Sequence, residues 1–265
     1  MDIYLLYKAI ILGIVEGLTE FLPVSSTGHL IIVGDALNFV GERAKTFEIF
    51  IQLGAILGVV WHYRRKVSDL VVNAAQPAER RFILNIFIAF LPAAVVGLLA
   101  HKYIKIYLFN STSVACALII GGVVILLIER YHRPGHIQNV EAITPLGALK
   151  VGCAQIFALF PGVSRSGATI MGGMLTGFDR KVATEFSFFL AIPTMFAATS
   201  YDLYKNIALL KAHDVVLFAV GFIMAFLTAL VVVKIFLAFV ARYTFRVFAY
   251  YRIVFGVLVL IYFAR

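Results

Sequence analysis

Two glutamates in an apolar stretch near the N-terminus are the first residues that suggest chemistry. Glu16 and Glu20 are four residues apart, so on a helix both carboxylates project from one face. Ionised carboxylates in apolar surroundings cost free energy unless they are paired or bind a cation. Because two adjacent carboxylates also repel each other, we predict that both hold a hard divalent ion, Mg²⁺ or Ca²⁺. The alternative is a surface pair facing water or a basic residue, which the apolar neighbours disfavour.

A turn rich in hydroxyl groups follows the glutamates. Pro23 ends the helix, and Ser25, Ser26, Thr27 and His29 come shortly after it. Hydroxyl side chains at the start of a helix commonly serve as N-caps, and a lone histidine is often a hydrogen-bonded buried side chain. A serine near a histidine is also typical of a nucleophile with its general base. The turn is therefore a candidate for binding phosphate and for carrying a nucleophile.

A second polar break contains an arginine. Residues 161–169 read Pro-Gly-Val-Ser-Arg-Ser-Gly-Ala-Thr and separate two apolar segments. The guanidinium of Arg165 is a planar, permanently charged donor suited to phosphate oxygens, and Ser164, Ser166 and Thr169 supply further hydroxyl donors. Backbone N–H groups at the start of the next helix would add to this anion site. The alternative is an interfacial arginine that snorkels to the membrane surface.

Together the two breaks suit a diphosphate ligand. A metal ion on the glutamates and the guanidinium of Arg165 would both offset its negative charge. A nucleophile could then attack the outer phosphorus, with a lipid phosphate as the leaving group. Catalysis of this kind rests mainly on positioning and on electrostatic stabilisation of the transition state.

The composition places these residues in a membrane protein. Hydrophobic residues make up 62% of the 265-residue chain and charged residues only 14%, against about 25% charged in an ordinary soluble domain. The net charge of +9 is interpreted as loop lysines and arginines that face anionic headgroups, so no nucleic-acid partner is expected. Cys116 and Cys153 lie in apolar segments and indicate neither a disulfide framework nor a metal site.

Ten apolar segments organise the chain as one integral membrane domain over 1–265. They are 3–22, 24–40, 47–62, 82–101, 112–129, 145–160, 166–178, 184–203, 214–240 and 245–263. Only the turn at Pro23 separates 3–22 from 24–40. Only the break around Arg165 separates 145–160 from 166–178. Such breaks at membrane depth are tolerated where the backbone lines a polar cavity or is buried in protein. We predict that each pair is a re-entrant helical hairpin.

The two halves of the chain resemble each other. The pattern Gly13, Glu16, Phe21 and Ser25 to Gly28 has counterparts in Gly152, Gln155, Phe160 and Ser164 to Gly167. We predict an all-α polytopic fold with two repeats, about 1–130 and 145–265, each of one hairpin plus three transmembrane helices. Because three spans are odd, the second repeat would be inverted, and the interrupted helices would meet at a central site. The basic loop near 63–81 then predicts that this loop is cytoplasmic and that both termini face outward.

At these residues the chain resembles the undecaprenyl-diphosphate phosphatase family, also called the bacitracin-resistance (BacA) family. The resemblance is carried by EGLTEFLPVSSTGH at 16–29 and PGVSRSGAT at 161–169. It continues through KTFEIFIQLGAI at 45–56, GGMLTGF at 172–178 and EFSFFLAIP at 185–193. It spans nearly the whole chain, and the two motifs together are specific.

The resemblance implies a bacterial inner-membrane enzyme. Such an enzyme hydrolyses undecaprenyl diphosphate to undecaprenyl phosphate and inorganic phosphate, which recycles the lipid carrier for peptidoglycan and other wall polymers. The resemblance also implies a divalent-metal requirement, bacitracin tolerance when the protein is abundant, and a site that opens to the periplasmic side.

The same resemblance assigns roles to the residues of the two breaks. Glu16 and Glu20 would serve the metal or water, and Arg165 would hold the phosphate. Ser26 and His29 would be nucleophile and base. The remaining hydroxyls would bind the substrate: Ser25, Thr27, Ser164, Ser166 and Thr169. The sequence leaves open whether Ser26 forms a covalent intermediate or orients water, and whether the protein forms a homodimer.

Three other functions fit parts of the sequence. A lipid or ion transporter, such as a flippase, commonly has inverted repeats with broken helices, and phosphate release from purified protein separates it from a phosphatase. An intramembrane serine protease is suggested by Ser26 and His29, but it leaves the glutamates and Arg165 without a role. A phosphatase of the phosphatidic-acid-phosphatase superfamily is suggested only by the fragment 133–136, which we interpret as a loop coincidence. Those enzymes need no metal, so chelation discriminates.

Overall fold

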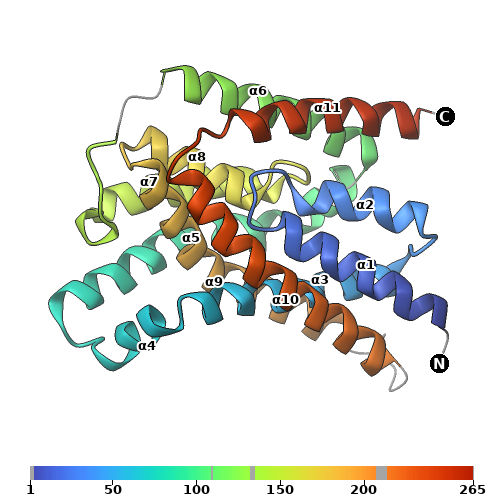
Figure 1. Cartoon of the computed structure of the whole chain (residues 1–265), viewed down its shortest axis with the longest axis horizontal. Helices are drawn as coiled ribbons and strands as arrows, with labels where there is room; N and C mark the ends of the chain where they lie inside the picture. The colour runs from blue at the N-terminus through green and yellow to red at the C-terminus, as the bar shows by residue number, and fades with distance from the viewer. Residues whose placement is uncertain (1–2, 109, 132–134, 207–213, 265) are drawn as a thin grey trace.

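The chain is almost entirely helical in the computed structural model, which describes residues 3–108, 110–131, 135–206 and 214–264 (Figure 1). The α-helices are α1 (Ile3–Thr19), α2 (Ser26–Ala36), α3 (Glu42–His62), α4 (Arg64–Val72), α5 (Pro77–Tyr107), α6 (Ser111–Tyr131), α7 (Pro145–Ile156), α8 (Arg165–Leu175), α9 (Arg180–Asn206), α10 (Val215–Val240) and α11 (Arg246–Phe263). Two 3₁₀ turns, η1 (Val140–Ala142) and η2 (Phe157–Leu159), flank α7. Within these ranges the only β pairing is one isolated bridge, so the predicted all-α class is confirmed.

Six of the described helices are long and apolar enough to cross a membrane. These stretches are Glu42–His62, Pro77–Ala100, Ser111–Tyr131, Arg180–Lys205, Val215–Val240 and Arg246–Phe263. The helices α1, α2, α7 and α8 have 17, 11, 12 and 11 residues, fewer than the roughly 20 that a crossing helix needs. The chain is therefore a polytopic helical membrane protein, and the short helices form the two pairs predicted around the polar breaks.

The basic stretch 63–81 differs from its prediction as a loop. Most of it is helical, because α4 fills Arg64–Val72 and α5 already begins at Pro77. None of the α4 residues is buried, so a search of the sequence for long apolar segments could not find this helix. The fragment 133–136 lies partly outside the described residues, since 133 and 134 are not among them.

Close helix packing fixes where the short helices lie. In Figure 1, α1 runs beside α10 and α6 runs beside α11, and α10 also packs on α3 while α7 packs on α5. A Cβ on Gly13 of α1 would collide with the Gly221 carbonyl of α10, and a Cβ on Gly152 of α7 would collide with the Ala89 carbonyl of α5. These glycines let the short helices approach their neighbours at backbone distance, and Gly13 lies one turn before Glu16.

Both polar breaks end in the same local structure. Ser25 and Ser164 have positive φ angles of 71° and 76°, which non-glycine residues rarely adopt. Each serine is the N-cap of the next short helix, and its hydroxyl accepts the backbone N–H of Gly28 (3.5 Å) or Gly167 (3.1 Å). The shared cap makes Ser26 and Arg165 the first residues of α2 and α8, so their side chains leave the two turns at equivalent positions.

Candidate active site

The two breaks, far apart in sequence, meet through Glu20. Its carboxylate accepts a hydrogen bond from the Ser26 hydroxyl at 2.5 Å on one oxygen. Its other oxygen accepts a hydrogen bond from the Arg165 guanidinium at 3.2 Å. The side chains of Glu20 and Arg165 are only 10% and 11% exposed. Three of the predicted catalytic residues therefore form one buried, charge-assisted network.

The Arg165 guanidinium has hydrogen-bond partners within the protein, but not for all of its donors. It donates to the Ser187 carbonyl of α9 at 3.1 Å, approaches the Met195 sulfur at 3.7 Å, and lies 5.5 Å from the centre of the Phe21 ring. Its Nε is buried and has no hydrogen-bond partner in the described part of the chain. A buried N–H without an acceptor costs free energy, and an anion beside the guanidinium would remove that cost.

Glu16 is a buried acidic side chain that, like the Nε of Arg165, lacks hydrogen-bond partners in the described chain. It is fully buried in α1 and lies within electrostatic reach of Glu20, Glu48 and Arg165. Neither of its carboxylate oxygens has a hydrogen-bond partner among the described residues. A buried carboxylate without donors is costly, and a bound cation would remove that cost.

The donor set fits a divalent metal ion that is shared with a ligand. Within the described ranges no three His, Cys, Asp or Glu side chains form a metal-binding group, so these residues alone do not supply a complete set of metal ligands. Mg²⁺ commonly binds one or two carboxylates and takes its other oxygens from substrate phosphates and water. Glu16 and Glu20 match this pattern better than the six to eight oxygen ligands that Ca²⁺ takes.

The predicted hydroxyls of the second break are occupied by the protein itself. Ser164 and Ser166 share a hydrogen bond of 3.0 Å, and Ser166 also donates to the Leu22 carbonyl of the first turn at 2.8 Å. Thr169 donates to the Arg165 carbonyl at 2.9 Å and shares a 2.6 Å hydrogen bond with Ser187. All three predicted residues are buried. Their contacts shape the turn and attach it to the first break.

His29 has partners other than Ser26. Its Nδ1 lies 2.7 Å from the Ser25 carbonyl, which can only accept, and its Nε2 lies 2.6 Å from the Tyr251 hydroxyl. The imidazole stacks on Phe255 with a centroid distance of 4.2 Å. In this geometry Nδ1 carries the proton and Nε2 accepts from Tyr251. The hydrogen bond of Ser26 goes to Glu20, so the predicted Ser26–His29 pair is not in contact here.

Two residues of α11 belong to this region and were not predicted. Tyr251 binds His29, and Arg252, which is 1% exposed, donates hydrogen bonds to backbone carbonyls of both turns. A signal for Arg252 was available, because a charged residue within an apolar transmembrane segment is expensive and therefore usually functional. Thr27, by contrast, is half-buried and makes no described hydrogen bond.

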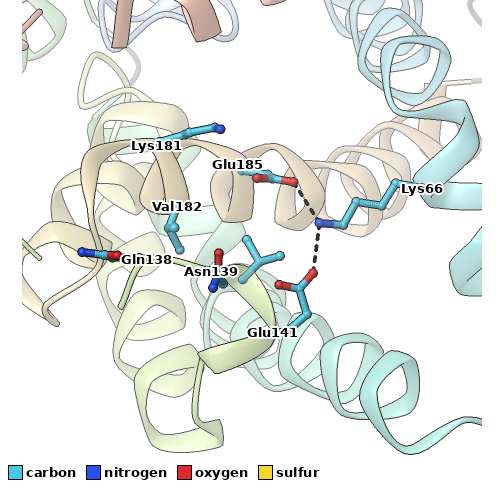
Figure 2. Close-up of a pocket in the computed structure, with 8 residues that line it drawn as sticks. Lys66, Gln138, Asn139, Glu141, Lys181, Val182 and Glu185 are labelled. Atoms are coloured by element: carbon cyan, nitrogen blue, oxygen red, sulfur yellow. Dashed lines mark hydrogen bonds and ion pairs between the residues drawn. The ribbon is translucent and has the colours of Figure 1, made fainter. Parts of the chain in front are cut away.

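A separate polar cavity of about 200 Å³ lies away from these residues (Figure 2). Lys66 lines it and pairs with Glu185 at 2.9 Å and Glu141 at 3.5 Å. Burial, and then the negative charge of Glu185, raise the pKa of the neighbouring Tyr63 phenol well above its usual range. The cavity lies between α4, the segment around η1 and α9, and its ion pairs give Glu185 a structural role.

The fold and this geometry define a polytopic helical membrane protein in which two carboxylates, a serine and an arginine meet in a buried centre. The chain belongs to the family of the bacitracin resistance protein BacA, whose model matches residues 9–258. It is 59% identical to an undecaprenyl-diphosphatase of Methylobacillus flagellatus, over 99% of this chain and 100% of that protein. It is 56% identical to an undecaprenyl-diphosphatase of Laribacter hongkongensis, over 98% of this chain and 96% of that protein.

Proposed function

We propose that this protein hydrolyses undecaprenyl diphosphate to undecaprenyl phosphate and inorganic phosphate. The reaction would return the lipid carrier to cell-wall polymer synthesis and confer bacitracin resistance. The observation that carries the proposal is the network in which Glu20 joins Ser26 to Arg165. Beside it lie a buried carboxylate and a buried guanidinium nitrogen that both lack partners in the described chain. A metal-bound diphosphate would give both groups a partner at once.

The reaction is a displacement at the terminal phosphorus. The Ser26 oxygen, or a water that Ser26 orients, forms the new bond to this phosphorus, and the bond to the bridging oxygen breaks. Glu20, which accepts the Ser26 hydrogen bond, takes the proton of the attacking group. Arg165 binds the oxygens of the transferred phosphoryl group, and undecaprenyl phosphate leaves with the bridging oxygen. After attack by Ser26 itself, water would release inorganic phosphate from the serine in a second step.

We assign the divalent metal to Glu16 and Glu20, with Mg²⁺ favoured over Ca²⁺ by the small number of protein ligands. When bound, the ion offsets the charge of the diphosphate. Ser25 and Thr27 at the first turn, together with Ser164, Ser166 and Thr169 at the second, complete the proposed substrate pocket. Because the last three hydroxyls already bond within the protein, we expect their contribution to come mainly through the shape of the turn.

We further propose that the two halves are inverted repeats with re-entrant hairpins, in a bacterial inner membrane. In the proposed repeat, α7 is the counterpart of α1 and α10 is the counterpart of α5. The packing follows this correspondence, because α1 packs on α10 and α7 packs on α5. The counterparts Glu16 and Gln155 are both buried and both keep an unpartnered polar atom among the described residues. We propose that the site opens to the periplasmic side. A homodimer stays a prediction that mass measurement in detergent would test.

Phosphate release from undecaprenyl diphosphate by detergent-purified protein tests the proposal. We expect release with Mg²⁺, loss with a chelator, and a fall of at least about 100-fold in Glu20→Ala and in Arg165→Ala, since each removes a charge at the transferring phosphoryl group. Glu141→Gln is the matched control, because Glu141 lies at the separate cavity with a 56% exposed side chain. Its activity should equal that of the wild type.

Two results would count against the proposal. Near-wild-type turnover in Glu20→Ala or Arg165→Ala would show that the active site is elsewhere, while the assignment as a phosphatase would still stand. Folded wild-type protein that releases no phosphate with any divalent metal would instead favour a lipid or ion transporter, for which the repeated packing of α1 on α10 and α7 on α5 is also suited.

A further inference from the structure

Arg252 of α11 has an unusual set of partners. Its side chain is 1% exposed, and each of its five N–H groups has a backbone carbonyl acceptor. The acceptors are Leu118 (3.3 Å), Ala117 (3.1 Å), Pro23 (3.1 Å), Val163 (2.9 Å) and Gly162 (2.9 Å). A guanidinium has five N–H donors in a fixed planar arrangement, so all of the hydrogen-bond donors of Arg252 have an acceptor.

These carbonyls come from the two turns of the site and from α6. Pro23 lies two residues before the cap Ser25, and Val163 lies two residues before Arg165. Carbonyls of an interrupted helix have no helical partner, and leaving them unpaired inside a membrane is costly. Arg252 satisfies carbonyls of both turns with one rigid group, so it fixes the distance and the orientation between the two backbones.

No carboxylate compensates the charge of Arg252 within the described chain. Its charge-bearing nitrogens have no Asp or Glu oxygen within 4.0 Å there, in contrast to Arg165 and Arg180, which each pair with a glutamate. A guanidinium stays protonated in proteins. Its placement is therefore not explained by an ion pair, and the carbonyls of the turns are what it binds.

We propose that Arg252 is a positioning residue for the phosphatase reaction, which rests on the proposed function. It holds the two turns in the register that lets Glu20 reach Ser26 and Arg165 together. It does not contact the substrate. Removing it should leave diphosphate binding largely intact and misplace the attacking group relative to the phosphorus.

The packing of α6 offers a second way to disturb this contact. Gly121 faces the guanidinium so closely that an added Cβ would collide with it. Gly121→Ala therefore displaces Arg252 without changing its charge or its chemistry. A positioning role predicts that Gly121→Ala has the same kind of defect as Arg252→Lys, which keeps the charge but replaces the planar fork with a three-donor ammonium.

Arg180→Lys is the matched control. Arg180 is a partly buried arginine at the first residue of a stretch long enough to span the membrane, and it binds Glu129 at 3.0 and 2.6 Å instead of the carbonyls of the turns. Arg180→Lys should lower the thermal stability, because an ammonium cannot reproduce the two contacts of the guanidinium with Glu129. A purely structural arginine would change the melting temperature and leave kcat per folded molecule unchanged.

The experiment measures kcat, KM and melting temperature for the wild type, Arg252→Lys, Gly121→Ala and Arg180→Lys with undecaprenyl diphosphate and Mg²⁺. We expect kcat to fall by about 10- to 100-fold in the first two variants, as for a displacement of about 1 Å. KM should change by less than about threefold, because ground-state binding is kept. Arg180→Lys should keep kcat within about twofold of the wild type.

Wild-type kcat in folded Arg252→Lys and Gly121→Ala would overturn the inference and leave the phosphatase assignment standing. A raised KM with unchanged kcat would also overturn it, because Arg252 would then act in substrate binding. An inactive wild type would instead overturn the proposed function, so the two failures are distinguishable.

Discussion

At the residue scale, the site combines one satisfied carboxylate and one unsatisfied carboxylate. Glu20 accepts hydrogen bonds from Ser26 and Arg165, whereas Glu16 is fully buried and its oxygens have no described donor. The two glutamates have the same side chain and lie one helical turn apart, so the difference comes from their neighbours. We therefore assign different roles, with Glu20 at the attacking group and Glu16 chiefly at the metal.

Glu16→Gln tests the metal role of Glu16. The amide keeps the shape and removes the charge, so the metal concentration for half-maximal activity should rise by at least about tenfold. The melting temperature without metal should stay the same or increase, because an unpaired buried charge is more costly than an amide. Metal titration of phosphate release, with thermal denaturation in detergent, measures both. An unchanged metal requirement would place the ion elsewhere.

Tyr251→Phe tests what the hydroxyl on His29 contributes. The substitution removes the 2.6 Å hydrogen bond to Nε2 and keeps the aromatic ring next to the imidazole. We expect a loss of about 1 kcal/mol in stability, which is typical of one hydrogen bond. The kcat of this variant should exceed that of His29→Ala, which removes the imidazole as well. Equal kcat values in the two variants would show that His29 acts only through Tyr251.

At the element scale, short helices and close glycine contacts position the turns. The caps Ser25 and Ser164 start α2 and α8 in the same way. Upstream, Gly13 and Gly152 bring α1 and α7 to backbone distance from α10 and α5. Glu16 therefore projects from a helix that is anchored one turn earlier, and Ser26 and Arg165 project from the helices that follow the two anchored helices.

Gly13→Ala should destabilise the protein through this anchoring contact. The new methyl group would collide with the Gly221 carbonyl and lie 2.9 Å from the Met224 Cβ, and overpacking of this kind costs about 1–3 kcal/mol. Gly97→Ala in α5 is the control, because its nearest neighbour is a Leu159 methyl group at 3.4 Å. Thermal denaturation of both variants gives the comparison. Equal stabilities would mean that α1 moves away from α10 without cost.

At the scale of the whole molecule, the proposed membrane orientation rests on the proposed inverted repeat and on the basic stretch 63–81. The helix α3 crosses between the exposed residue Val40 and the exposed residue Ala75. If the basic stretch is cytoplasmic, these two positions lie on opposite sides of the membrane. The same orientation gives the first turn its proposed access from the periplasmic side.

Cysteine labelling tests that orientation. In a Cys116→Ser, Cys153→Ser background, Val40→Cys should react with a membrane-impermeant maleimide in intact cells. Ala75→Cys should react only after permeabilisation, because the positive-inside rule places its basic neighbours in the cytoplasm. The opposite pattern would reverse the topology and would move the proposed opening of the site to the cytoplasmic side.

The sequence by itself determined the membrane class, the ten apolar segments with their two polar breaks, and the residue types of the site. These follow from local composition and from the spacing of Glu16 and Glu20, because hydrophobic length and helical periodicity are properties of a single segment. The same local signals missed α4, which buries none of its residues.

Only the tertiary structure decided which side chains meet. In the structure Ser26 donates a hydrogen bond to Glu20 and not to His29, and His29 is hydrogen-bonded to Tyr251 instead. Arg252 donates to backbone carbonyls of both turns. Each of these contacts depends on how helices from distant parts of the chain pack against one another. Periodicity within a segment carries no information about such packing, because it fixes a face of a helix but not the partner of that face.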